Sequence, residues 1–197
     1  MSDKIIRKIA VIFVTDVVSF SKLMERDEDQ TLQSFRACKS ILDNLFEEHS
    51  GRIFNTAGDS VLAEFPSAVS AVICAAEFQK LVKERNASVE PLAEMHFRVG
   101  LNMGDVIVEG HNLYGDGVNV AARLEALSQP DGVCLSKSIH DFVSQKVDLA
   151  FKDLGDQKVK NTIVHAFDMT LEGMAVRELK QTESDVKSDG GTPPAIA

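Results

Sequence analysis

The chain has 197 residues, with 21 Lys and Arg against 30 Asp and Glu, so its formal net charge is −9. One domain of ordinary size fits this length, and the 44% apolar content predicts a packed core over most of it. The acidic balance argues against a sequence-independent nucleic-acid binder, which needs clustered Lys and Arg. We expect no membrane insertion, because no apolar run approaches the roughly 20 residues of a membrane helix.

The N-terminal segment and the cysteines predict a cytoplasmic protein. The apolar stretch in MSDKIIRKIAVIFVTD is short, β-branched and ends at a charge, unlike a signal peptide. Cys38, Cys74 and Cys134 are odd in number and lack CxxC spacing, which disfavours a disulfide framework or a zinc site. We interpret them as buried thiols in a reducing compartment.

Strand-type and helix-type patterns alternate along the chain. Residues 8–15 are β-branched and aromatic without a helical stripe, which predicts a buried strand. The other expected elements, in chain order, are a short helix or turn at 17–27, a helix at 29–49, a hairpin of strands 52–56 and 60–65, a helix at 68–85, strands at 96–102 and 105–109 joined near Gly104, a Gly-rich loop at 110–117, a helix at 117–128, a strand at 132–136, a short helix at 138–145, and strands near 149–154 and 164–169.

This order predicts an α+β fold: a ferredoxin-like βαββαβ palm followed by a C-terminal βαβ extension. We expect the helices on one face of a mostly antiparallel sheet. Residues 1–171 form this domain, whereas 172–197 lose the periodicity and end in a polar, Gly- and Pro-containing stretch that predicts a disordered tail.

Asp16 and Asp59 are the first candidate site residues. Asp16 ends the buried strand, and Asp59 lies in the hairpin turn after Gly58. Alone, Asp16 is equally explained as a helix cap or turn residue, and Asp59 is better explained by the geometry of the turn. In a β-α-β-β unit, however, the first strand and the hairpin lie side by side, so the two carboxylates can converge. Carboxylates placed together repel unless a cation lies between them, which suits Mg²⁺ with water and phosphate oxygens as its other ligands.

Asn119 and Arg123 are the second candidate pair. They stand four residues apart on one helix, behind a Gly-rich loop, and therefore share a face. Backbone N–H groups at a helix N-terminus favour an anion, and Arg can bind phosphate through two parallel hydrogen bonds. The spacing alone also allows an exposed Asn and an Arg paired with Glu125 or a neighbour.

Several ordered segments together resemble the class III nucleotidyl cyclases, the adenylate/guanylate cyclase catalytic domain, and a bacterial subgroup of them in particular. The resemblance covers roughly residues 7–170. The matching segments are Asp16-Val17-Val18-Ser19-Phe20-Ser21, Thr56-Ala57-Gly58-Asp59, Gly104-Asp105-Val106, Tyr114 through Glu125, Asp153-Leu154-Gly155 and Val159-Lys160-Asn161.

The resemblance implies cyclisation of a nucleoside triphosphate to the 3′,5′-cyclic monophosphate and pyrophosphate. It implies that Asp16 and Asp59, with the Val17 carbonyl, hold two divalent cations, Mg²⁺ or Mn²⁺. It further implies that Asn119 positions the ribose, Arg123 stabilises charge on the α-phosphoryl group, and Lys160 contacts the terminal phosphates. Family sites lie at a head-to-tail dimer interface, so a homodimer with shared active sites is expected.

Two positions depart from the family pattern and concern the base. Adenylate cyclases usually carry Lys and Asp (or Thr) where this chain has Asn55 and Asn112, and guanylate cyclases carry Glu at the first of them. An Asn amide both donates and accepts hydrogen bonds. We therefore expect ATP as the substrate, with weakened purine selectivity.

Other functions stay open at this point. The chain could be a degenerate cyclase domain that acts as a nucleotide-binding or dimerisation module, or a cyclase with relaxed or GTP preference. A partner domain completed by another cyclase chain is less consistent with the sequence, because both half-sites occur in one chain.

Overall fold

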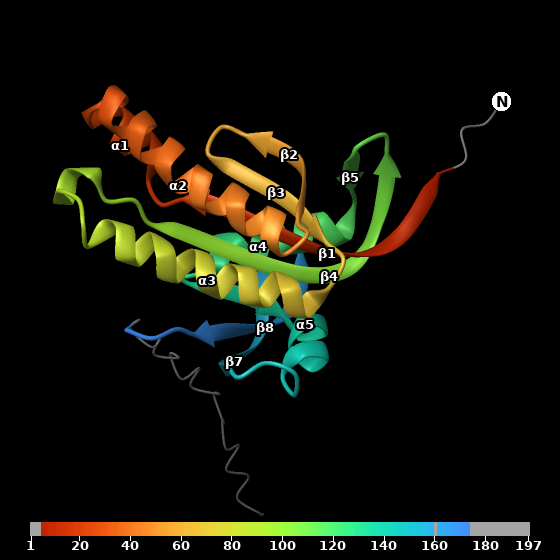
Figure 1. The fold of residues 1–197 in the computed structure, drawn as a ribbon. Coiled ribbons are helices and arrows are strands. Elements are labelled where there is room, and N and C mark those ends of the chain that lie inside the picture. The colour runs from red at the N-terminus through yellow and green to blue at the C-terminus, as the bar shows by residue number, and fades with distance from the viewer. Residues whose placement is uncertain (1–4, 160, 174–197) are drawn as a thin grey trace, which may run out of the picture.

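The computed structural model describes residues 5–159 and 161–173 (Figure 1). In chain order the elements are β1 (Ile6–Val17), α1 (Phe20–Arg26), α2 (Glu28–Glu48), β2 (Arg52–Ala57), β3 (Ser60–Phe65), α3 (Ala68–Asn86), the short 3₁₀ helix η1 (Pro91–Ala93), β4 (Phe97–Glu109), β5 (Asn112–Tyr114), α4 (Asp116–Leu127), β6 (Val133–Ser136), α5 (Lys137–Val143), β7 (Ala150–Val159) and β8 (Thr162–Thr170). The predicted tail at 172–197 lies almost wholly outside the described residues.

A single sheet organises the domain, with strand order β2-β3-β1-β4-β6-β8-β7 and β5 paired to β4. The first four strands in this order form the palm that the βαββαβ pattern predicts. Pairing is antiparallel except between β4 and β6, which run parallel and are joined by a crossover through α4. The α+β fold class is therefore confirmed, and the C-terminal extension continues the same sheet.

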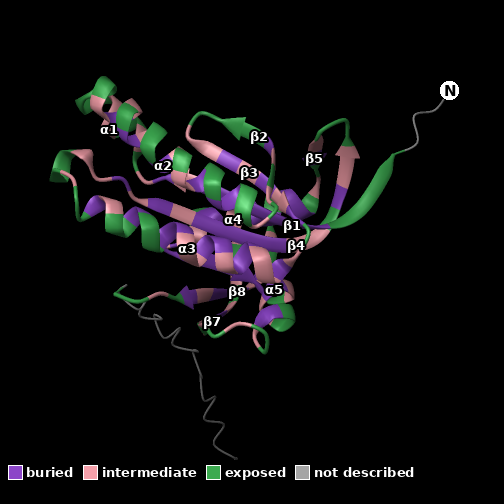
Figure 2. Cartoon of the chain, viewed as in Figure 1, coloured by how far each residue is buried: buried purple, intermediate pink, exposed green. Residues whose placement is uncertain are grey.

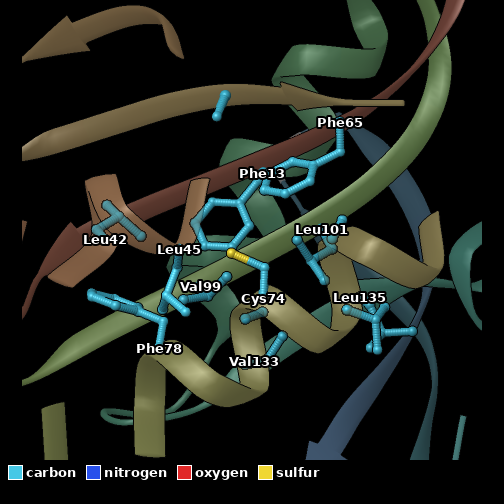
Figure 3. Packing of buried hydrophobic residues seen from close by; sticks show 14 of the residues in the cluster. Phe13, Leu42, Leu45, Phe65, Cys74, Phe78, Val99, Leu101, Val133 and Leu135 are labelled. Atoms are coloured by element: carbon cyan, nitrogen blue, oxygen red, sulfur yellow. The ribbon is translucent and has the colours of Figure 1, made fainter. Parts of the chain in front are cut away.

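Helices cover both faces of the sheet, so the prediction of helices on one face is wrong. Odd-numbered β1 residues such as Phe13 belong to a large apolar cluster with α2 and α3, part of which Figure 3 shows. Even-numbered residues such as Ile12 belong to a second cluster with α4. The cause is the parallel β4–β6 connection, which needs a crossover helix and places it on the face that α2 and α3 leave open.

β4 is one continuous strand of 13 residues, not the two strands expected on either side of Gly104. It pairs with β1 over the whole length of that strand, from Ile6↔Val108 to Val17↔Phe97. The long antiparallel partner explains why the glycine does not interrupt the strand. The expected loop at 110–117 likewise contains the short strand β5, which folds back on the end of β4.

Burial follows this layered arrangement (Figure 2). The middle of β1 is buried, whereas Ile6 and Ile9 at its start are 59% and 67% exposed. The three cysteines are buried, as expected, and burial raises the pKa of the Cys74 thiol to about 12.

α4 lies directly on β4 because the strand carries a glycine where the helix crosses it. A Cβ at Gly100 would lie 2.2 Å from the backbone nitrogen of Glu125 and 2.3 Å from the carbonyl oxygen of Ala121. The helix contributes Gly117, where a Cβ would lie 2.7 Å from the carbonyl oxygen of Asp105. Only hydrogen atoms fit at these two positions without moving backbone.

Gly100→Ala should therefore lower the free energy of unfolding by about 3 kcal/mol, because the added methyl group meets helix backbone that cannot rotate away. Gly104→Ala on the same strand is the matched control: its nearest neighbours are the Asn102 amide at 3.3 Å and the Cα of Gly117 at 3.4 Å. We expect the control to lose about 1 kcal/mol or less. Urea unfolding measures the free energy of unfolding of both variants. Equal losses in the two variants would contradict the close contact between α4 and β4 at Gly100.

Candidate active site

The two aspartates that the sequence predicts to converge lie together in the structure. Asp59 is in the turn between β2 and β3, and the pairing of Val61 with Thr15 places this turn beside the end of β1. The Oδ2 atom of Asp59 accepts a hydrogen bond from the backbone N–H of Val17 at 3.0 Å, and its carboxyl group also hydrogen-bonds with that of Asp16. Asp16 is the penultimate residue of β1, which is a central strand of the sheet and not an edge strand.

The electrostatics of this pair suit a divalent cation. The pKa of Asp16 is raised to about 7, first by burial, then by the hydrogen bond and charge of Asp59, and further by the charge of Glu125. A cation held by both carboxylates would replace the shared proton and relieve the repulsion. Among the described residues, no group of three or more His, Cys, Asp or Glu side chains could hold a metal ion. A cation at Asp16 and Asp59 would therefore need main-chain, water or phosphate oxygens as well.

Sequence reasoning missed Arg98, which is the partner of Glu125 in the structure. Arg98 is the β4 register partner of Asp16, and its Nε atom lies 3.2 Å from Oε1 of Glu125 on α4, without the alignment of a hydrogen bond. Glu125 is buried, and its ion pair is with Arg98, not with Arg123, which was one of the alternatives that the spacing left open. Burial raises the pKa of Glu125 although Arg98 acts against this. Strand register was the missing information.

Asn119 and Arg123 share a face of α4, as expected, and that face points away from the sheet. Asn119 is exposed and Arg123 is half-buried, whereas Gly117, Ala121 and Leu124, three of the six buried residues of the helix, lie on the opposite side. The Nη1 atom of Arg123 is buried and has no hydrogen-bond partner among the described residues. The body of the helix therefore separates this pair from Asp16 and Asp59 within one copy of the chain.

The remaining predicted residues are placed less completely. Asn55 is exposed on β2, and Asn112 begins β5, where its Nδ2 donates to the Tyr114 hydroxyl at 3.2 Å. Val17 is buried, and no contact of its carbonyl oxygen tests the predicted role as a ligand. Lys160 lies outside the described residues, so its role stays a prediction.

No helix in the described part of the chain combines the length and apolarity that crossing a bilayer takes. The cytoplasmic location stays a prediction.

Comparisons with known proteins agree with this geometry. A family model described as the adenylate and guanylate cyclase catalytic domain matches residues 1–173. A curated protein of Rhizobium meliloti (strain 1021), named "Putative adenylate cyclase 3", is 46% identical over 160 residues, which are 81% of this chain and 27% of that protein. The chain thus spans about a quarter of the length of this curated relative.

Solved structures are similar over almost the whole domain. The adenylate/guanylate cyclase/hydrolase from Silicibacter pomeroyi is 34% identical with a TM-score of 0.78, covering 84% of this chain and 98% of that one. The adenylyl cyclase CyaB from P. aeruginosa is 21% identical with a TM-score of 0.73, covering 90% of this chain and 100% of that one. At that identity the second likeness shows the fold alone.

The raised pKa of Asp16 has a consequence for stability. Because the folded state favours protonated Asp16, its ionisation costs stability, and the contribution of Asp16 to the free energy of unfolding should fall as the pH rises from about 4 to about 7. Asp16→Asn should therefore melt at a higher temperature than wild type at about pH 8 and at nearly the same temperature at about pH 4.

Thermal melts at both pH values, with and without Mn²⁺, measure this effect. Added Mn²⁺ should stabilise wild type more than the variant, since a ligand stabilises only the state that binds it. Glu84→Gln, an exposed acid on α3, is the control. If Asp16→Asn were less stable than wild type at the higher pH, the argument that Asp16 and Asp59 repel each other would be wrong.

Proposed function

The chain belongs to the family of adenylate and guanylate cyclase catalytic domains, and from this we propose that it converts ATP to 3′,5′-cyclic AMP and pyrophosphate at sites shared by two copies of the chain. The observation that carries the proposal is the convergence of Asp16 and Asp59, two crowded carboxylates from segments distant in the sequence. In the reaction the ribose 3′-oxygen forms a bond to the α-phosphorus, the bond to pyrophosphate breaks, and the 3′-hydroxyl loses its proton.

Asp16 and Asp59, with the Val17 carbonyl, would hold two cations, Mg²⁺ or Mn²⁺. When bound, such ions lower the pKa of the attacking hydroxyl and offset the charge of the triphosphate. Arg98 adds a half-buried positive charge across the strand from Asp16, and Glu125 fixes the near edge of its guanidinium group. Arg98 is thereby placed to attract the anionic substrate toward the carboxylates.

Asn119 and Arg123 act on the substrate of the neighbouring copy. Their position on the outer face of α4, away from the carboxylates of the same chain, supports this division. Asn119 orients the ribose, and Arg123 stabilises charge that develops on the α-phosphoryl group. Arg123 brings to this task a buried Nη1 that has no hydrogen-bond partner in the described part of the chain. A symmetric homodimer in head-to-tail arrangement then holds two complete sites, and Lys160 contacts the terminal phosphates.

Mixing two inactive variants tests whether the active sites are shared between two copies of the chain. Asp59→Ala and Arg123→Ala should each lower cyclase activity by at least about a hundredfold, because each removes charge stabilisation from every site of a homodimer. An equimolar mixture should recover about a quarter of wild-type activity, since half the dimers are mixed and each of these holds one intact site.

Cyclic-product assays on the separate and mixed variants, after dissociation and reassociation, measure this recovery. A mixture of Asp59→Ala with Asp16→Ala is the matched control and should stay inactive, because both changes fall on the same half-site. Recovery in the control, or none in the test mixture, would count against shared sites. Absence of any cyclic product from dimeric wild type would favour the degenerate, nucleotide-binding module.

Asn55 and Asn112 lead to a prediction about which purine base the site prefers. The Asn112 oxygen can accept from the adenine 6-amino group and the Asn55 amide can donate to a ring nitrogen, but neither residue carries a charge. We expect ATP to be used in preference to GTP, with a raised KM. Asn55→Lys should lower the KM for ATP, because the longer, charged side chain reaches the ring nitrogen better. Product yields from ATP and GTP test this, and a strong preference for GTP would overturn the assignment.

A further inference from the structure

A charged network joins the two strands that carry the proposed base-reading amides. Arg52 of β2 donates from Nη1 to the carbonyl oxygen of His111 at 2.8 Å and from Nη2 to Oε2 of Glu64 at 2.7 Å. His111 directly precedes Asn112, and Arg52 stands three residues before Asn55 on the same strand. One side chain thus connects the segment of each amide.

A β-bulge gives the β2 segment its direction. Ile53 pairs with Ala63 and Asn55 pairs with Leu62, so Phe54 is the extra residue. Two consecutive residues, Phe54 and Asn55, therefore face one partner, and the bulge turns Asn55 to the α4 side of the sheet, where regular alternation would have pointed it to the other side. Phe54 is buried in the same apolar cluster as Leu113 of β5.

β5 is a short strand whose one buried residue, Leu113, packs in that cluster. It has three residues and pairs with β4 at three register positions at one end of that strand. Strands this short lack stability of their own. The hydrogen bond from Arg52 to the His111 carbonyl is thus a long-range restraint on the position of Asn112 relative to β2.

Glu64 holds Arg52 in place for this contact. Its side chain is 16% exposed and forms ion pairs with both Lys8 and Arg52. Burial pushes the pKa of Glu64 upward, but the hydrogen bonds and charges of Lys8 and Arg52 keep it below its ordinary value. The carboxylate is thus ionised near neutral pH and fixes the Arg52 guanidinium from one edge while the other edge reaches His111.

We propose that Arg52 is a positioning residue for base recognition, which holds β5 against β2 so that Asn55 and Asn112 reach the purine together. This inference rests on the proposed function and concerns the base end of the substrate, not the phosphates. Arg52 acts through the two amides and touches neither the cations nor the reacting oxygen.

The test compares Arg52→Met, which keeps the aliphatic stem but removes the donors, with wild type. The KM for ATP should rise about three- to tenfold, the loss of one hydrogen bond to the loop, while kcat stays within about twofold. Inorganic tripolyphosphate has no base, so its inhibition constant should stay within about twofold. Glu64→Gln should give the same pattern, and the double variant should be no worse than Arg52→Met, because both changes break one network.

Arg26→Ala is the matched control: Arg26 is another exposed arginine that donates to a distant carbonyl, that of Leu92 at 2.8 Å, from α1. It should leave the KM for ATP unchanged. Thermal melts check that all variants fold. An unchanged KM for ATP in Arg52→Met, or a parallel rise in the tripolyphosphate inhibition constant, would overturn the inference. Absence of cyclic AMP from wild type itself would reject the proposed function instead, so the two failures are distinguishable.

Discussion

The contact between α4 and β4 at Gly100 is the constraint on which the candidate site depends. Helix backbone occupies the space where a side chain would stand, so the helix cannot shift without moving the strand. This contact places Glu125 beside Arg98 and therefore near Asp16, which β4 faces across the ladder with β1. It also directs Asn119 and Arg123 to the opposite side of the helix. One close backbone contact thus positions both groups of candidate residues.

The like charges at the carboxylate site lower the stability of the isolated domain. Asp16, Asp59 and Glu125 are acidic groups in partly buried surroundings, with Arg98 as a nearby compensating cation. Burying like charges together costs free energy, and proteins retain such arrangements where function requires them. Here the cost is consistent with a place that takes up cations together with an anionic substrate. The pKa of Asp16, raised to about 7, reflects that cost, because the ionised form is disfavoured there.

The base end of the proposed site is built differently, from backbone irregularity and a surface network. The bulge at Phe54 re-aims Asn55, and Arg52 ties β2 to the loop before Asn112. Neutral amides can face either hydrogen-bonding pattern of a purine, so the selectivity of such a pair depends on how firmly its geometry is held. In the proposed site Arg52 and Glu64 would therefore affect base recognition, although neither would contact the nucleotide.

The sequence by itself determined the order of the elements, the α+β class and the convergence of Asp16 with Asp59, because hydrophobic periodicity and the rules of strand connection are local or nearly local. It also placed Asn119 and Arg123 on one helix face. Only the tertiary structure decided that α4 covers the second face of the sheet, that β4 runs unbroken through Gly104, and that Glu125 pairs with Arg98. These features follow from strand register and from helix–strand contact between residues distant in the chain, which no local pattern encodes.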